Sequence, residues 1–384
     1  MKKVTFTLIL LLPFIQGCGL SGAYIFFGDK AWENYKEAIK NAQYDEAQTF
    51  VKAAYGNYKD SLTYDEIRYP LVYLKLAETS YVMKKSPSEP IGWIKRGLSN
   101  VPDNHHLMAG LGKYIFFSAK LTKKDGDHKK LINEAKEQYR AALISDPLHP
   151  DFNAGLMNVF FYEIEKNKFE ANESKNKFLI TQVEELFENL IDINSEAVEE
   201  ARGVLAFLKG DYKTAIEKLS SILQQDYVRY EDSRSRYYLA RSYVEAKRYD
   251  DAISISTDVL NVNEDDFQIR GERAIAYYLM GDTSAGVLDL EWMEDKSPKY
   301  HEFFYRLGRL FYKQNLSKKA QLYLLKAFRL DGENGNYAFA LGENYLLEGN
   351  TRAARKFFDR AASAAPVGSD LEKRSQQRLT EIGG

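Results

Sequence analysis

The chain has 384 residues, of which 45% are hydrophobic and 28% are charged, and its formal net charge is −2. Because 53 basic residues are balanced by 55 acidic ones, no excess of positive charge is present to neutralise phosphates, which argues against a nucleic-acid partner. Few prolines and a 14% share of aromatic residues suit an all-helical chain whose rings fill the gaps between helices.

The first residues have the pattern of a targeting segment. Lys2 and Lys3 form a positive start, and the apolar run 4–15 that follows is too short to cross a bilayer as a stable helix. The run ends at Gly17-Cys18, which contains the only cysteine of the chain. This pattern resembles a bacterial lipoprotein signal peptide with its lipobox, although Gln16 is a less usual occupant. The resemblance implies that residues 1–17 are removed and that Cys18 is lipidated.

The same resemblance implies a location. Residue 19 is Gly rather than the Asp that retains many lipoproteins at the inner membrane. We therefore expect a lipid-anchored protein at the outer membrane that faces the periplasm, with residues 18–28 as a short tether. If the leader is not processed, a cytoplasmic scaffold is the alternative.

Residues 29–195 are interpreted as degenerate helical hairpins with two polar insertions. Ala135, Tyr139 and Pro147 follow the spacing of the second helix of a hairpin. The first insertion, 120–130, is interpreted as a lengthened turn between helices. The second, 163–177, precedes a helix predicted at 178–191.

Residues 196–368 contain a regular repeat with a period of 34 residues. Small residues occupy one position of each predicted first helix, at Ala240, Ala274, Gly308 and Gly342, and one position of each second helix, at Ala252, Gly286, Ala320 and Ala354. In the last unit, 335–366, Gly349-Asn350 supplies the turn. An earlier unit has extra length, which is assigned to a loop at 226–232.

This period and its pattern of small and aromatic residues resemble a tetratricopeptide repeat. The resemblance implies an all-α fold, a right-handed α–α superhelix of about nine hairpins, because one hairpin cannot bury its apolar face alone. Residues 369–384 are expected to contain a polar capping helix.

The resemblance also implies that the first helices line a concave groove. The residues at the groove-facing positions are Arg234, Tyr237, Arg241, Tyr278, Tyr305, Arg309 and Tyr312. Arginine and tyrosine dominate binding hot spots, so a partner-binding groove is one interpretation. The alternative is that these rings pack against the adjacent hairpin and the arginines pair with local carboxylates.

No catalytic constellation or metal site is evident, and we expect no cofactor. His105 and His106 point in different directions on a helix, which suits one metal ion poorly. We expect a non-enzymatic scaffold that binds envelope proteins in its groove and the membrane through Cys18. Envelope assembly, secretion and exopolysaccharide export are the roles that the resemblance suggests. A ligand- or peptide-binding component associated with a transporter is the alternative.

Overall fold

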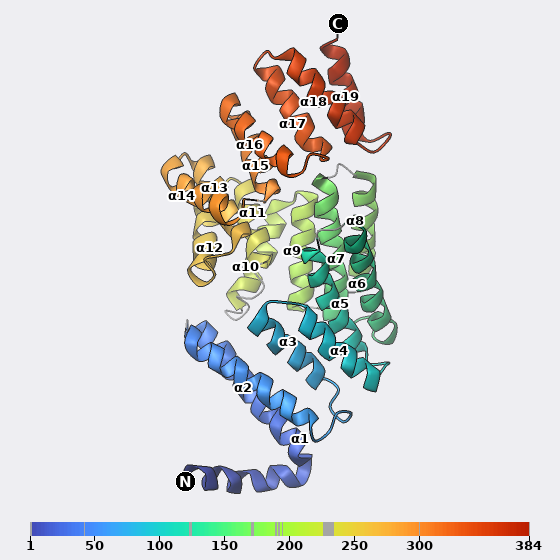
Figure 1. Cartoon of the computed structure of the whole chain (residues 1–384), viewed down its shortest axis with the longest axis vertical. Coiled ribbons are helices and arrows are strands. Elements are labelled where there is room, and N and C mark those ends of the chain that lie inside the picture. The colour runs from blue at the N-terminus through green and yellow to red at the C-terminus, as the bar shows by residue number, and fades with distance from the viewer. Residues whose placement is uncertain are drawn as a thin grey trace. The chain divides into compact units, whose positions relative to one another are not determined.

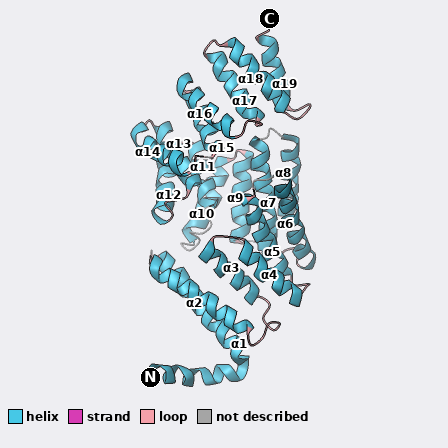
Figure 2. Cartoon of the chain, in the orientation of Figure 1, coloured by secondary structure: helices cyan, strands magenta, loops and turns pink. Residues whose placement is uncertain are grey.

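The computed structural model describes residues 2–41, 43–122, 125–169, 173–188, 190, 193, 195–225, 234–298 and 300–383. Side chains at 2–18, 125, 167–169, 173–174, 224–225 and 234 are not part of that description. Over the described residues the chain forms nineteen helices and no strand (Figures 1 and 2). The all-α prediction is therefore confirmed.

Contacts divide the chain into two units, which we describe separately. The first contains Met1–Val159, Asn189–Val198 and Gln225–Tyr230, and the second contains Phe160–Glu188, Glu199–Gln224 and Glu231–Gly384. The helices of the first unit, the last of which continues into the second, are α1 (Lys2–Lys40), α2 (Tyr44–Leu62), α3 (Val72–Lys84), α4 (Ser88–Asn100), α5 (His105–Leu121), α6 (Asp125–Ser145) and α7 (Pro150–Phe169).

The remaining helices lie wholly or mostly in the second unit. They are α8 (Glu173–Glu188), α9 (Glu196–Lys209), α10 (Tyr212–Gln225), α11 (Arg234–Glu245), α12 (Tyr249–Val262), α13 (Phe267–Met280), α14 (Thr283–Lys296), α15 (His301–Lys313), α16 (Ser317–Leu330), α17 (Gly335–Leu347), α18 (Thr351–Ala364) and α19 (Asp370–Glu381). Consecutive helices pack in pairs, for example α5 with α6 in the first unit and α15 with α16 in the second.

The α17–α18 hairpin shows why the repeat needs small residues. Gly349 has a φ of +74°, which favours glycine, and the Asn350 side chain accepts a hydrogen bond from the Ala353 amide at 3.1 Å to begin α18. A Cβ atom at Gly342 would lie 2.6 Å from the fully buried ring of Phe358. The two helices therefore approach at a distance that only a glycine permits here.

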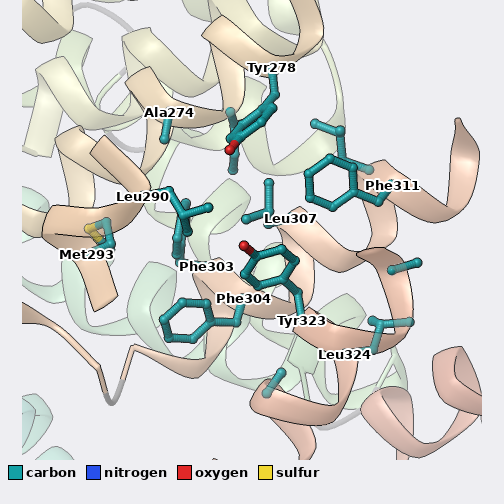
Figure 3. Packing of buried hydrophobic residues seen from close by; sticks show 14 of the residues in the cluster. Ala274, Tyr278, Leu290, Met293, Phe303, Phe304, Leu307, Phe311, Tyr323 and Leu324 are labelled. Carbon is teal, nitrogen blue, oxygen red and sulfur yellow. The ribbon is translucent and has the colours of Figure 1, made fainter. Parts of the chain in front are cut away.

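Large apolar side chains fill the space between hairpins of the second unit (Figure 3). Phe303, Phe304 and Leu307 of α15 are almost completely buried. They form one cluster with residues of neighbouring helices, which include Tyr278, Leu290, Met293, Tyr323 and Leu324. Burying each large apolar side chain stabilises the fold by roughly 1.5–3 kcal/mol. A hairpin's stability therefore depends on its neighbours.

The prediction that the insertion at 120–130 is a lengthened turn is wrong. Helix α5 continues to Leu121 and α6 begins at Asp125, so most of the insertion lengthens the two helices. The physical reason includes His128, which is buried and whose Nδ1 lies 2.9 Å from the Ala119 carbonyl oxygen. A polar stretch that can pack one side against its partner helix is more stable as helix than as loop.

The second polar insertion is also mostly helical. Helix α7 continues to Phe169, and α8 begins at Glu173 rather than at residue 178 and ends at Glu188. Lysine and glutamate are good helix formers, so these residues extend the hairpin. The predicted loop at 226–232 lies outside the described residues.

The predicted tether, 18–28, lies within α1, whose helix is interrupted at Gly19 with a φ of +70°. The Cys18 side chain is outside the described residues, so its lipidation remains a prediction. Where the structure describes the chain, no helix combines the length and the apolar character needed to cross a bilayer. At the other end, α19 packs on α18, and its Leu371 is buried. That α19 acts as a cap remains a prediction.

Candidate functional site

Four charged side chains of alternating sign connect four helices in the second unit. They are Glu165 on α7, Arg241 on α11, Glu272 on α13 and Arg306 on α15, and we call them the charge ladder. Two carboxylates and two guanidinium groups give the ladder a net charge of zero. Each arginine lies beside a carboxylate of another helix.

The ladder is held by direct contacts. Arg241 Nη1 donates to Glu165 Oε1 at 2.7 Å, and Arg241 Nε lies 3.9 Å from Glu272 Oε1. Arg306 forms a bidentate pair with Glu272, in which Nη2 donates to Oε2 at 2.8 Å and Nη1 donates to Oε1. Such forked pairs are among the stronger hydrogen bonds in proteins.

The ladder is largely shielded from solvent. The Glu272 side chain is 1% exposed, and those of Arg241 and Arg306 are 14% and 18% exposed. Burial by itself would lower the pKa of Arg241, but Tyr237 and the neighbouring carboxylates raise that pKa well above its usual value. The pKa of Arg306 is raised in the same way, because Glu272 outweighs the effect of burial. Both arginines therefore remain charged, and the ladder carboxylates balance their positive charges.

Aromatic rings position Arg241. Its guanidinium carbon lies 4.7 Å from the ring centroid of Phe207 on α9 and 5.2 Å from that of Tyr237, one turn earlier on α11. The Tyr237 hydroxyl is 3.1 Å from Arg241 Nη1, and Tyr238 donates from its hydroxyl to Glu165 Oε2 at 2.8 Å. Helical spacing thus places the Tyr237 ring against Arg241. The neighbouring Tyr238 contacts Glu165, the ion-pair partner of Arg241.

Glu302 lies next to the ladder and differs from its members, because no ion pair is found for it among the described residues. The residue is half-buried at the start of α15. Burial raises the pKa of its carboxyl to about 7, Glu165 adds to the rise, and the ladder arginines oppose it. A carboxyl with this pKa changes its charge near neutral pH.

The structure places the predicted groove residues whose side chains it describes in two environments. The Arg234 side chain lies outside the described residues. Arg241 is a largely shielded member of the ladder and Tyr237 is buried beside it, while Tyr278 is 6% exposed, with its ring edge-on to Phe311 at 5.4 Å. These three offer little surface to a partner. Their part in partner binding stays a prediction.

The other three predicted residues share one face of α15, and we call Tyr305, Arg309 and Tyr312 the α15 patch. All three are half-buried. Tyr305 stacks on the buried ring of Tyr337 at 4.6 Å, and the Arg309 guanidinium carbon lies 5.2 Å from the Tyr312 ring centroid. Arg309 has no carboxylate partner among the residues that the structure describes, so its charge remains available.

Three members of the ladder were not predicted as site residues. A usable signal existed for two of them, since Glu272 and Arg306 are 34 residues apart and thus occupy the same position in consecutive repeats. Opposite charges at equivalent positions can meet across a hairpin interface. No comparable signal exists for Glu165, which is 76 residues from Arg241.

In the first unit, His106 lies near His105 and His149, with ring centroids 4.5 and 5.4 Å apart. His149 also stacks on Phe152 at 3.7 Å. Within the described part of the chain, however, no group of His, Cys, Asp and Glu side chains is arranged to hold a metal ion. The ring contacts instead join the start of α5 to the start of α7.

Comparison with protein families gives a match to a tetratricopeptide repeat model at residues 200–256 and 305–369. These segments are similar to tetratricopeptide repeats. The matched residues include Arg241 and the whole α15 patch. No curated protein matches the chain significantly.

Solved structures are similar to this chain at low sequence identity. Human IFIT1, determined as a dimer with m7Gppp-AAAA, is 13% identical over 89% of this chain and 78% of its own, with a TM-score of 0.57. A thermophilic tetratricopeptide protein of Thermus thermophilus is 20% identical over 48% of this chain and all of its own, with a TM-score of 0.41. MamA is 19% identical over 45% of this chain and 96% of its own, with a TM-score of 0.34. The IFIT1 likeness extends to the fold alone.

We predict that Glu272→Gln destabilises the protein strongly. Removing one carboxylate leaves the buried Arg306 without its bidentate partner, which should lower the free energy of unfolding by about 3 kcal/mol. The double substitution Glu272→Leu with Arg306→Met should recover most of that loss. Urea denaturation of the full chain measures both. Glu333→Gln is the matched control, because Glu333 is 91% exposed in its pair with Arg360. An equal effect of Glu272→Gln and the control would contradict the shielding of the ladder.

We also predict a pH-dependent effect of Glu302→Gln. The carboxyl pKa of Glu302 is raised from 4.5 to about 7 on folding, so the protonated form stabilises the native state. That stability is complete below pH 4.5 and is lost as the pH rises through about 7. The variant should therefore melt at a higher temperature than the wild type at about pH 8, and at the same temperature at about pH 4.5. An equal difference at both pH values would show that Glu302 is not the titrating group.

Proposed function

We propose that this protein is a non-enzymatic scaffold that binds another protein through the α15 patch. The observation that carries the proposal is Arg309, a cation beside Tyr312 that has no carboxylate partner within the described residues. The ladder arginines are neutralised internally, whereas Arg309 can pair with an acidic group of a partner. Tyr305 and Tyr312 supply the rigid ring surface that is typical of binding hot spots.

The tetratricopeptide repeats support this role, because proteins built from such repeats act as protein–protein interaction scaffolds. The α15 patch belongs to the α15–α16 hairpin, which is followed by the α17–α18 hairpin and α19. The IFIT1 structure contains RNA, but the net charge of −2 in this chain does not favour a polyanionic partner. An acidic or mixed protein segment fits the patch better.

We further propose that the scaffold is lipid-anchored through Cys18 at the outer membrane and acts in the periplasm. The support is the sequence from Lys2 to Cys18, with its basic start, short apolar run and Gly-Cys end. Envelope assembly, secretion or exopolysaccharide export would each use a tethered adaptor of this kind.

A photo-crosslinking residue at position 309, introduced in the full chain in its native envelope, should capture the partner for identification. With that partner purified, Tyr305→Ala combined with Arg309→Ala should weaken binding at least about tenfold, because hot-spot truncations typically cost more than 1 kcal/mol each. Calorimetric titration measures the dissociation constant, and circular dichroism checks that helicity is unchanged.

The matched control is Leu322→Ala with Arg352→Ala. Both residues are exposed and lie on the second helices α16 and α18. This control variant should bind like the wild type. Equal affinity of the patch variant and the control variant would remove the α15 patch as the binding surface.

The anchor predicts a specific mature N-terminus. Mass spectrometry of the protein purified from membranes should find a peptide that begins at Cys18 and carries acyl chains. Cys18→Ala should abolish both processing and membrane attachment. An unmodified Met1 in the native protein would refute the anchor and favour a cytoplasmic scaffold.

A further inference from the structure

A cavity of about 260 Å³ lies in the second unit at the end of the charge ladder. Its lining includes Glu165, Phe207, Lys209, Tyr212, Arg241 and Glu245. Pockets for whole drug-sized ligands are usually larger, about 300–1,000 Å³. The size therefore suits one side chain or one small organic group.

The charges around the cavity are compensated with one exception. Arg241 is paired with Glu165 at 2.7 Å, and Lys209 Nζ lies 2.7 Å from Glu184 Oε1. Glu245, the last residue of α11, is exposed and has no ion pair or hydrogen bond among the described residues. An uncompensated carboxylate at the cavity wall attracts a cation.

Two aromatic rings form another part of the wall. Phe207 near the end of α9 and Tyr212 at the start of α10 flank a tight turn in which Gly210 has a φ of +84°. The turn brings their ring centroids to 5.8 Å. Burial raises the pKa of the Tyr212 hydroxyl, and the nearby charge of Glu245 raises it further. The Tyr212 ring and the Glu245 carboxylate therefore line the same small cavity.

One aromatic ring of the cavity wall, that of Phe207, already contacts a cationic side chain of this protein. The guanidinium group of Arg241 lies 4.7 Å from the ring centroid of Phe207. Rings attract cations through the negative charge of their faces, and a nearby carboxylate adds to that attraction. The lining offers no unpaired basic group to attract an anion, because its two basic side chains, Lys209 and Arg241, are both paired.

From this arrangement we infer that the cavity binds an organic monocation, an alkylammonium or guanidinium group, between the Glu245 carboxylate and the ring of Tyr212. The group can belong to a lysine or arginine side chain of a partner protein or to a free amine. The site does not depend on the α15 patch, so it stands or fails separately from the proposed function.

The test uses the purified full chain in detergent micelles and ligand-observed NMR titration. The probe is n-butylguanidinium, with butyrate as the anionic counterpart. Butylguanidinium should bind saturably, with a dissociation constant on the order of 1 mM for so small a ligand. Butyrate should not bind. Glu245→Gln should weaken binding about two- to fivefold, as expected for loss of one exposed ion pair.

Three further variants separate the site from general effects of charge and folding. Tyr212→Leu should weaken binding, whereas Tyr212→Phe, which keeps the ring, should bind like the wild type. Glu217→Gln removes an exposed carboxylate from α10, outside the cavity lining, and should change nothing. No saturable binding, equal binding by Glu245→Gln, or equal binding of butyrate would overturn the proposal.

A blocked pentapeptide with one central lysine and the free polyamine spermidine then distinguish the two sources. Tighter binding of the peptide identifies a protein side chain as the ligand, and tighter binding of spermidine identifies a free amine. In either case Glu245→Gln must reduce the affinity for the site to stand.

Discussion

The constraint on which the structure depends is the close approach of paired helices at small residues. A Cβ atom at Gly308 would lie 2.8 Å from the Leu324 side chain, and one at Gly342 would lie 2.6 Å from that of Phe358. Because each hairpin leaves one apolar side uncovered, the next hairpin must pack on it, as Phe303 and Phe304 do in the cluster of Figure 3. The repeat interval therefore follows from packing, and a change at one interface affects the neighbouring ones.

The same stacking brings charges of successive first helices together. Glu272 and Arg306 meet because equivalent positions of adjacent repeats lie side by side, and their desolvation is compensated by a bidentate contact. Replacing such a pair by apolar residues need not destabilise a protein, whereas removing one partner leaves a shielded charge unpaired. The ladder also removes Arg241 from the charges available to a partner, whereas neither Arg309 nor Glu245 has an ion pair among the described residues.

Much of the fold could be predicted, and less of the site. The turn at Gly349, the buried Ala354 and Phe358, and the terminal helix followed from local spacing and turn chemistry. The polar insertion at 120–130 was misjudged, because its residues form helix only when one side packs against a partner, as His128 does. Among the groove residues, a pattern of arginine and tyrosine could not distinguish the internally paired Arg241 from the unpaired Arg309.

By itself, the sequence determined the helical class, the repeat interval and the positions of the small residues, because these depend on contacts within one hairpin or between adjacent hairpins. Only the tertiary structure decided which charges far apart in the sequence compensate one another. Arg241 is neutralised by Glu165, 76 residues away, and Glu302 acquires a pKa of about 7 from burial beside that carboxylate. Electrostatic energies depend on distance and solvent exposure in space, and neither can be obtained from the order of residues along the chain.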